Sequence, residues 1–177
     1  CIKNKLTSLD ISNNLFLIEL WCNDNNLTVL DVSGIDLYVL VCDNNQLTTI
    51  DNLSDNISLK HLSCSGNNIA SLLLLANPEL NWLSCSKNQL FQLDISGQMA
   101  LNYLFVWDNP SLSCINVADV SLAIATWSVW NGQSGNIDGH HYFSNNCNAT
   151  GITDYSGQRK LIRVLDVFGR SIMPKPN

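Results

Sequence analysis

Apolar and polar residues follow a frame along this chain that returns about every 21 residues. The segments LIELWCNDNNL, LYVLVCDNNQL, LKHLSCSGNNI and LNWLSCSKNQL share the pattern L-x-x-L-x-C-x-x-N-x-L. CIKNKL is a truncated first copy, and LNYLFVWDNPSL is a degenerate last copy. A coil of this length cannot bury its own apolar face and must stack on its neighbours. The pattern therefore predicts a solenoid.

Each coil contains two short alternating stretches that predict extended backbone. The first forms a parallel ladder of strands at 20–22, 40–42, 62–64, 83–85 and 104–106. The second follows the Asn of each frame, as in LTVLDVS and LFQLDIS. Coils this short leave no room for a helix on the far side, where we expect short extended or 3₁₀ segments. The predicted fold is a right-handed, mainly β superhelix with little helix.

The recurring Asn has a structural role in this interpretation. Its side-chain amide can satisfy backbone groups of the turn in a neighbouring coil, which forms an internal ladder. The members are Asn4, Asn25, Asn45, Asn67, Asn88 and Asn109.

Six of the seven cysteines fall into two groups. Cys22, Cys42, Cys64 and Cys85 share one inward position of the frame, so we expect buried free thiols. Cys114 and Cys147 lie outside this ladder and flank the region after the last repeat. We expect them to form a disulfide, which indicates an oxidising, extracytoplasmic setting.

Asp10, Asp31, Asp51 and Asp94 also recur in register. A row of carboxylates can bind calcium. The spacing of Asp to a following Ser favours the other interpretation, a turn closed by a side-chain-to-backbone hydrogen bond.

The repeat ends after Asn109-Pro110, which divides the chain into three parts. Residues 1–113 form the array, and residues 114–147 form a cap with a short helix at about 120–126, capped by Asp119. Residues 148–177 contain a linker and an alternating stretch, LIRVLDVFGRSI, that predicts a strand followed by a turn. Because the chain opens on Cys within an interrupted repeat, we expect it to be a fragment.

The net charge of −6 and the pI near 4.7 argue against nucleic acid, which needs a basic footprint. No apolar run is long enough to span a bilayer. Only 14% of residues are charged, so the surface suits recognition by hydrogen bonds. We expect a monomer.

Catalytic motifs are missing from the sequence: it has no G-x-S-x-G, no H-E-x-x-H and no Gly-rich phosphate loop. We therefore expect no enzyme and no cofactor. His140 and His141, with Asp138 nearby, can be interpreted as a partial metal site or as a polar loop, and we favour the loop.

Aromatic residues mark the outward side of the predicted strand ladder. Clusters of exposed aromatic side chains often mark binding surfaces. An alternative stays open, in which segment 114–147 folds back over Phe105 and Trp107. The candidate ligand-binding residues are Trp21, His61, Trp82, Tyr103, Phe105 and Trp107.

The frame resembles the leucine-rich repeats of surface and secreted proteins of the Bacteroidetes, particularly flavobacteria. CINVADV…NIDGHHYFSNNC is similar to the cap that follows such arrays, which supports the Cys114–Cys147 pair. RKLIRVLDVFGRSIMPKPN resembles the opening of a type IX secretion sorting domain through Val164, Asp166, Gly169 and Arg170. This resemblance implies a protein that is secreted or attached to the cell surface.

These observations lead to the hypothesis of a non-catalytic recognition module that binds a protein or a glycan through the aromatic side of the strands. The alternative is a structural spacer that displays another domain and has no ligand of its own.

Overall fold

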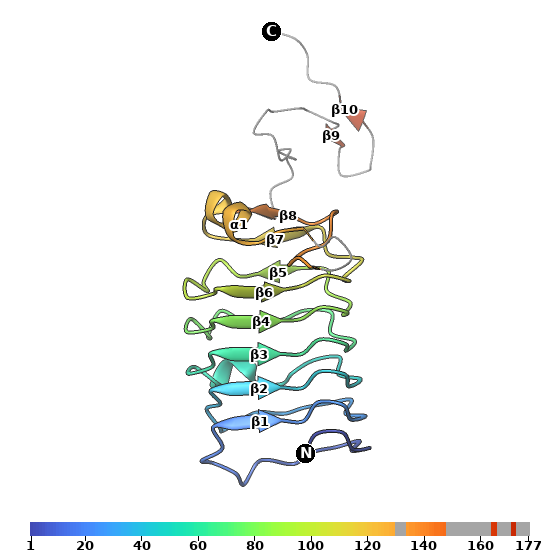
Figure 1. Cartoon of the computed structure of the whole chain (residues 1–177), viewed down its shortest axis with the longest axis vertical. Helices are drawn as coiled ribbons and strands as arrows, with labels where there is room; N and C mark the ends of the chain where they lie inside the picture. The colour runs from blue at the N-terminus through green and yellow to red at the C-terminus, as the bar shows by residue number, and fades with distance from the viewer. Residues whose placement is uncertain (130–133, 148–163, 166–170, 173–177) are drawn as a thin grey trace. The chain divides into compact units, whose positions relative to one another are not determined.

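The computed structural model describes residues 1–129 and 134–147, together with the backbone of two short strands, β9 (Val164–Leu165) and β10 (Ser171–Ile172). The chain divides into two compact units, Cys1–Asn145 and Asn146–Asn177. The first unit is a stack of coils (Figure 1). In the second, β9 and β10 pair antiparallel. The linker that we expect after residue 147 and the sorting-type residues Asp166, Gly169 and Arg170 lie outside the described residues.

The first sheet runs along the stack and is parallel and in register. Its order is β1-β2-β3-β4-β6, and the central residue of every strand is a leucine that pairs with the leucine of the next. The strands begin one residue earlier than the alternation predicts. They are β1 (Glu19–Trp21), β2 (Val39–Val41), β3 (His61–Ser63), β4 (Trp82–Ser84) and β6 (Tyr103–Phe105).

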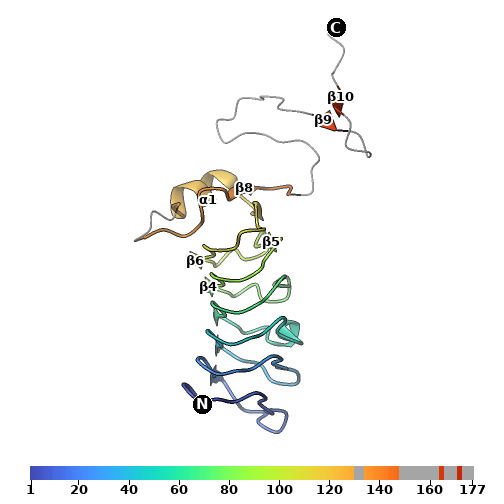
Figure 2. The same ribbon diagram turned by 90° about the vertical axis from the view of Figure 1, so that its right-hand side faces the viewer.

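A second sheet has the order β5-β7-β8, with β5 at Leu93–Asp94, β7 at Cys114–Asn116 and β8 at Tyr142–Ser144. Figure 2 shows β5 on the opposite side of the coil from β4 and β6. Among the described residues, the other predicted far-side strands are reduced to a bridge between Asp31 and Asp51 and a 3₁₀ turn, η1 (Leu53–Asp55).

The recurring aspartates of the far side close turns with their own side chains. Asp10, Asp31 and Asp94 each accept the backbone N–H of the serine two residues later, at 2.9–3.0 Å. That N–H is then used within its own turn rather than in a strand ladder. These bonds match the turn role that the spacing favours. The pKa of Asp10 is lowered by hydrogen bonds from the Ser12 hydroxyl and N–H, and that of Asp31 by bonds from the Asn52 side chain and from Ser33.

The buried asparagine ladder is confirmed in all copies but the first. Asn67 donates to the carbonyl oxygens of Cys64 (3.0 Å) and Cys42 (3.1 Å), and its Oδ1 accepts the N–H of Leu47 at 3.0 Å. Asn25, Asn45, Asn88 and Asn109 make equivalent bonds. Asn4 is exposed and bonds only within its own turn, because no earlier coil lies beneath it in the described chain.

A second amide ladder lies inside the far side of the stack and was missed by the sequence reasoning. Asn77 donates to the carbonyl oxygens of Leu53 (3.1 Å) and Asn56 (2.8 Å), and Gln98 donates to that of Leu74 (2.7 Å). Asn56, Asn77 and Gln98 are all buried. Their regular spacing along the chain is the signal that could have identified them.

The turn before each ladder asparagine uses left-handed backbone. Asn44, Gly66 and Lys87 directly precede ladder asparagines and have φ values of 52°, 68° and 55°. Asn and Gly adopt this region readily, whereas Lys does so at a cost. At Gly66 an added Cβ would also lie 2.6 Å from Oδ1 of Asn44, so a side chain there would require the Asn44 side chain to move.

A short helix and strand β8 follow the last coil of the array. Helix α1 spans Val120–Thr126, and the Asp119 side chain accepts the N–H of Leu122 as the N-cap. Trp127 packs on Phe143 of β8, with ring centroids 5.7 Å apart. Cys114 and Cys147 are the disulfide-bonded cysteines, whereas the other five are free. The expected disulfide is therefore confirmed.

Candidate functional site

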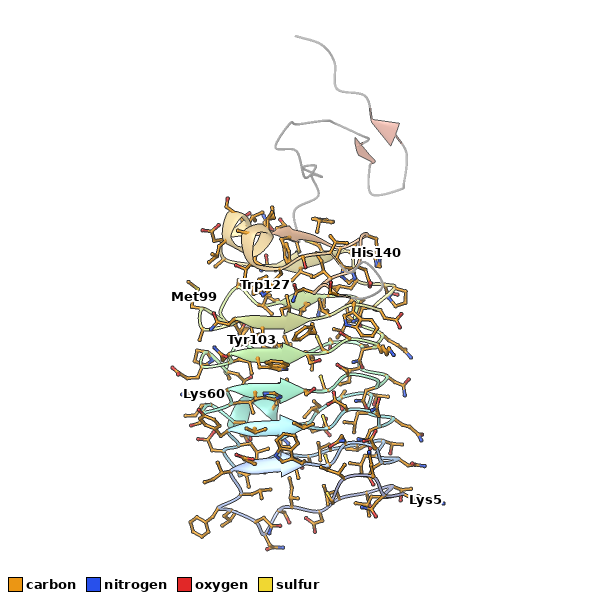
Figure 3. The ribbon with its side chains drawn as sticks, viewed as in Figure 1. Lys5, Lys60, Met99, Tyr103, Trp127 and His140 are labelled. Carbon is orange, nitrogen blue, oxygen red and sulfur yellow. The ribbon has the colours of Figure 1, made fainter. Side chains whose placement is uncertain are left out.

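The outward side of the first sheet, which we name the strand face, carries the candidate ligand-binding residues. Leu20, Leu40, Leu62, Leu83 and Leu104 point into the core, so the residues on either side of each leucine point outward. Because the strands pair in register, equivalent residues form columns along the stack. Figure 3 shows the side chains of this face, with Tyr103 labelled.

Aromatic rings stack in one of these columns. His61, Trp82 and Tyr103 occupy the first position of successive strands. The ring centroids of His61 and Trp82 lie 5.2 Å apart with planes within 9°, and those of Trp82 and Tyr103 lie 4.9 Å apart. Phe105 also contacts Trp82, at 5.2 Å. Both faces of the Trp82 ring are therefore covered, and the column presents ring edges to solvent.

The six candidate aromatic and His residues all reach the surface. Trp21 is 44% exposed and Tyr103 is 51% exposed. His61, Trp82, Phe105 and Trp107 are partly exposed, so the cap does not bury Phe105 or Trp107. Two other positions that the alternation places outward, Val41 and Ser86, are buried.

A hollow of about 450 Å³ lies beside Trp82 on the strand face, which we name the serine hollow. Small residues form its floor, because Ser63, Ser65, Ser84 and Ser86 occupy columns that hold large side chains in other coils. Asp43 lies toward its N-terminal end in the stack. The remaining lining residues are Asn44, Gly66, Trp82, Lys87, Phe105 and Trp107. A second hollow, of about 420 Å³, lies on the other side of Trp82 and is lined by Lys60, Glu79 and Tyr38 among others.

Asp43 is a half-buried carboxylate at the edge of the serine hollow, and two serines donate hydrogen bonds to it. Its oxygens accept hydrogen bonds from the Ser63 hydroxyl at 2.8 Å and from the Ser65 N–H at 2.6 Å. Burial raises the pKa of Asp43 above its usual value, although these two bonds oppose the shift. The sequence placed Asp43 on the outward side but gave no sign that it would be half-buried beside a hollow.

The four ladder cysteines are buried free thiols, as predicted. Burial raises the pKa of Cys22 to about 11 and that of Cys85 to about 12. The pKa values of Cys42 and Cys64 also lie well above the usual value for the same reason. Because the thiolate is the reactive form, these residues act as core side chains.

The structure brings Asp138, His140 and His141 together, with one potential ligand atom of each within 4.8 Å of the others. His141 is buried, and both of its ring nitrogens have partners. Nδ1 accepts the N–H of Asp138 at 3.2 Å, and Nε2 lies 3.3 Å from the carbonyl oxygen of Asn109. Asp138 in turn accepts the N–H of Asp108 at 2.7 Å. This pattern supports the favoured interpretation of a polar loop. Its hydrogen bonds connect residues 138–141 to the backbone around Asn109, the last ladder asparagine.

The stability of this attachment should depend on pH. Burial lowers the pKa of His141 below 6.5, although the bond to Asn109 and the Asp138 carboxylate favour the charged ring. Protonation therefore favours the unfolded state. The contribution of His141 is present above about pH 6.5 and is lost as pH falls through the lowered folded value. The midpoint of thermal unfolding should fall between pH 7.5 and pH 5 in the unmodified chain, and it should fall less in His141→Gln. His140→Gln is the control and should show the same fall as the unmodified chain. If His141→Gln also showed the same fall as the unmodified chain, this role of His141 would be contradicted.

No helix among the described residues is long and apolar enough to cross a membrane.

Comparison with known proteins shows similarity to a solved structure. The functional domain of InlJ from Listeria monocytogenes, described as including a cysteine ladder, is 26% identical with a TM-score of 0.35. The match covers 64% of this chain and 37% of that chain, so this chain spans well under half of its neighbour's length. No family model matches the chain, and no curated protein matches it. From its own repeat and its in-register strands, the chain is a leucine-rich-repeat-type solenoid, mainly β and with little helix.

Proposed function

We propose that this chain is a non-catalytic recognition module that binds a protein partner through the strand face. The observation that carries the proposal is the column of His61, Trp82 and Tyr103, held rigid by stacking and exposed along its edges. Rigid aromatic side chains lose little conformational entropy on binding and are common anchors of protein interfaces. The disulfide supports action outside the cytoplasm.

The same geometry argues for a protein rather than a glycan at this column. A sugar ring that stacks on an aromatic residue needs an open ring face. His61 and Tyr103 cover the two faces of Trp82, so the column offers edges that suit insertion among the side chains of a partner. A solenoid also provides the extended surface that such binding uses.

The test is a screen of the intact chain against arrays of extracellular proteins and of glycans. Tyr103→Ala should weaken binding to a protein ligand by roughly 30-fold, the size of a typical interface anchor. Phe91→Ala is the matched control, because Phe91 is an exposed aromatic outside the strand face. Equal affinity of Tyr103→Ala and the unmodified chain would contradict the site. The lack of a ligand on both arrays would favour the spacer.

A further inference from the structure

The carboxylate of the serine hollow, Asp43, is stabilised by hydrogen bonds and by the more distant His61 rather than by an ion pair. Asp43 lies half-buried at one end, and in the described part of the chain no Lys, Arg or His nitrogen lies within ion-pair distance of it. A carboxylate withdrawn from water without a counter-ion is unfavourable. A ligand that brings a positive charge would therefore gain more here than at an exposed carboxylate.

The remaining polar groups of the hollow suit a ligand with several N–H donors. Ser86 lines the hollow and is only 2% exposed, yet its hydroxyl has no hydrogen-bond partner. The hydroxyls of Ser65 and Ser84 bond to each other at 2.8 Å, so each keeps acceptor capacity. The floor therefore offers oxygen acceptors in addition to the carboxylate.

The volume and the walls fit a long side chain rather than a single ion. The hollow of about 450 Å³ is lined by residues of four successive coils, from Asp43 to Trp107. Trp82 and Phe105 form an apolar wall beside the serines, against which a methylene stem can pack. Lys87 also lines the hollow, and its Nζ lies 5.0 Å from the centroid of the Trp107 ring in a cation–π contact.

We propose that the serine hollow is an anchor site for an arginine side chain of a partner protein, with its guanidinium on Asp43 and its stem along Trp82. This inference rests on the proposed function and adds the chemistry of the partner. Arginine fits better than lysine because its planar head has five donors for the carboxylate and the serine hydroxyls.

The experiment uses two neutral-ended probes that differ only in charge, acetyl-arginine amide and acetyl-citrulline amide. Each is titrated into the whole labelled chain, and binding is followed by the backbone N–H signals of Ser63, Ser65 and Lys87 in NMR spectra. The arginine probe should bind with a Kd on the order of a millimolar, as its size predicts. The citrulline probe should bind at least tenfold more weakly.

Two isosteric variants locate the charge that is recognised. Asp43→Asn keeps an oxygen for Ser63 and Ser65 but should weaken binding of the arginine probe at least tenfold. Asp24→Asn is the control, because Asp24 is a nearby carboxylate that does not line the hollow, and it should change Kd less than threefold.

Several outcomes would overturn the proposal: equal binding of both probes, an unchanged Kd in Asp43→Asn, shifts confined to other surfaces, or binding of methyl glucoside in place of arginine. The array screen separates this inference from the proposed function. A protein ligand that depends on Tyr103 but is unaffected by Asp43→Asn would leave the recognition module intact and refute the arginine anchor.

Discussion

Asn67→Ala is expected to destabilise the array by about 2–4 kcal/mol, because it leaves the buried N–H of Leu47 without an acceptor and removes one of the two amide donors on each of two buried carbonyl oxygens. Asn67 accepts the N–H of Leu47 and donates to the carbonyl oxygens of Cys42 and Cys64, which also accept from Asn45 and Asn88 respectively. Each buried polar group left unsatisfied costs about 1–3 kcal/mol. Urea unfolding followed by circular dichroism measures the change.

The matched control for this prediction is Asn68→Ala. Asn68 is the exposed neighbour, and its side chain only accepts a 3.3 Å bond from Gln89. Its loss should change the free energy of unfolding by no more than about 0.5 kcal/mol. Similar values for Asn67→Ala and Asn68→Ala would show that the internal ladder does not stabilise the stack.

Asn67→Asp tests the same ladder through charge. The carboxylate can accept the N–H of Leu47 but cannot donate to the carbonyl oxygens of Cys42 and Cys64, and its charge is buried beside them. The neutral acid is tolerated better than the anion. Stability of this variant should therefore rise as pH falls toward 4, opposite to the trend expected from His141.

Removal of the Cys114–Cys147 disulfide is expected to destabilise the cap by about 3–4 kcal/mol. The disulfide closes a loop of about 30 residues, and without it the unfolded chain gains the corresponding conformational entropy. Both cysteines are disulfide-bonded, and the loop between them contains α1 and β8. Because a solenoid is stabilised mainly between neighbouring coils, the loss should be concentrated at the cap.

Hydrogen exchange of the Cys114→Ala/Cys147→Ala double variant measures where stability is lost. Amides of α1 and β7 should exchange much faster, whereas amides of β2 and β3 should change little. Cys1→Ala is the control, because Cys1 is an exposed free cysteine. Uniform acceleration along the whole stack would contradict a local role of the disulfide.

Much of the strand face could be predicted from the sequence because a parallel, in-register ladder repeats one environment in every coil. The position of Tyr103 in its frame already indicates that its side chain points outward, as the structure shows. The frame could not show how neighbouring outward side chains cover one another. Val41 and Ser86 occupy outward positions and are nevertheless buried.

The sequence by itself determined the repeat, the inward leucines and cysteines, the asparagine ladder, the capping helix and the disulfide-bonded pair, because each follows from local periodicity or from a residue's place in the frame. Only the tertiary structure decided that the faces of Trp82 are covered, that His141 has partners on both ring nitrogens, and that Asp43 lies half-buried beside a serine floor. These features depend on side chains from different coils and from the cap meeting in space. The relative sizes of these side chains, and not their spacing along the chain, decide which parts of the surface stay exposed.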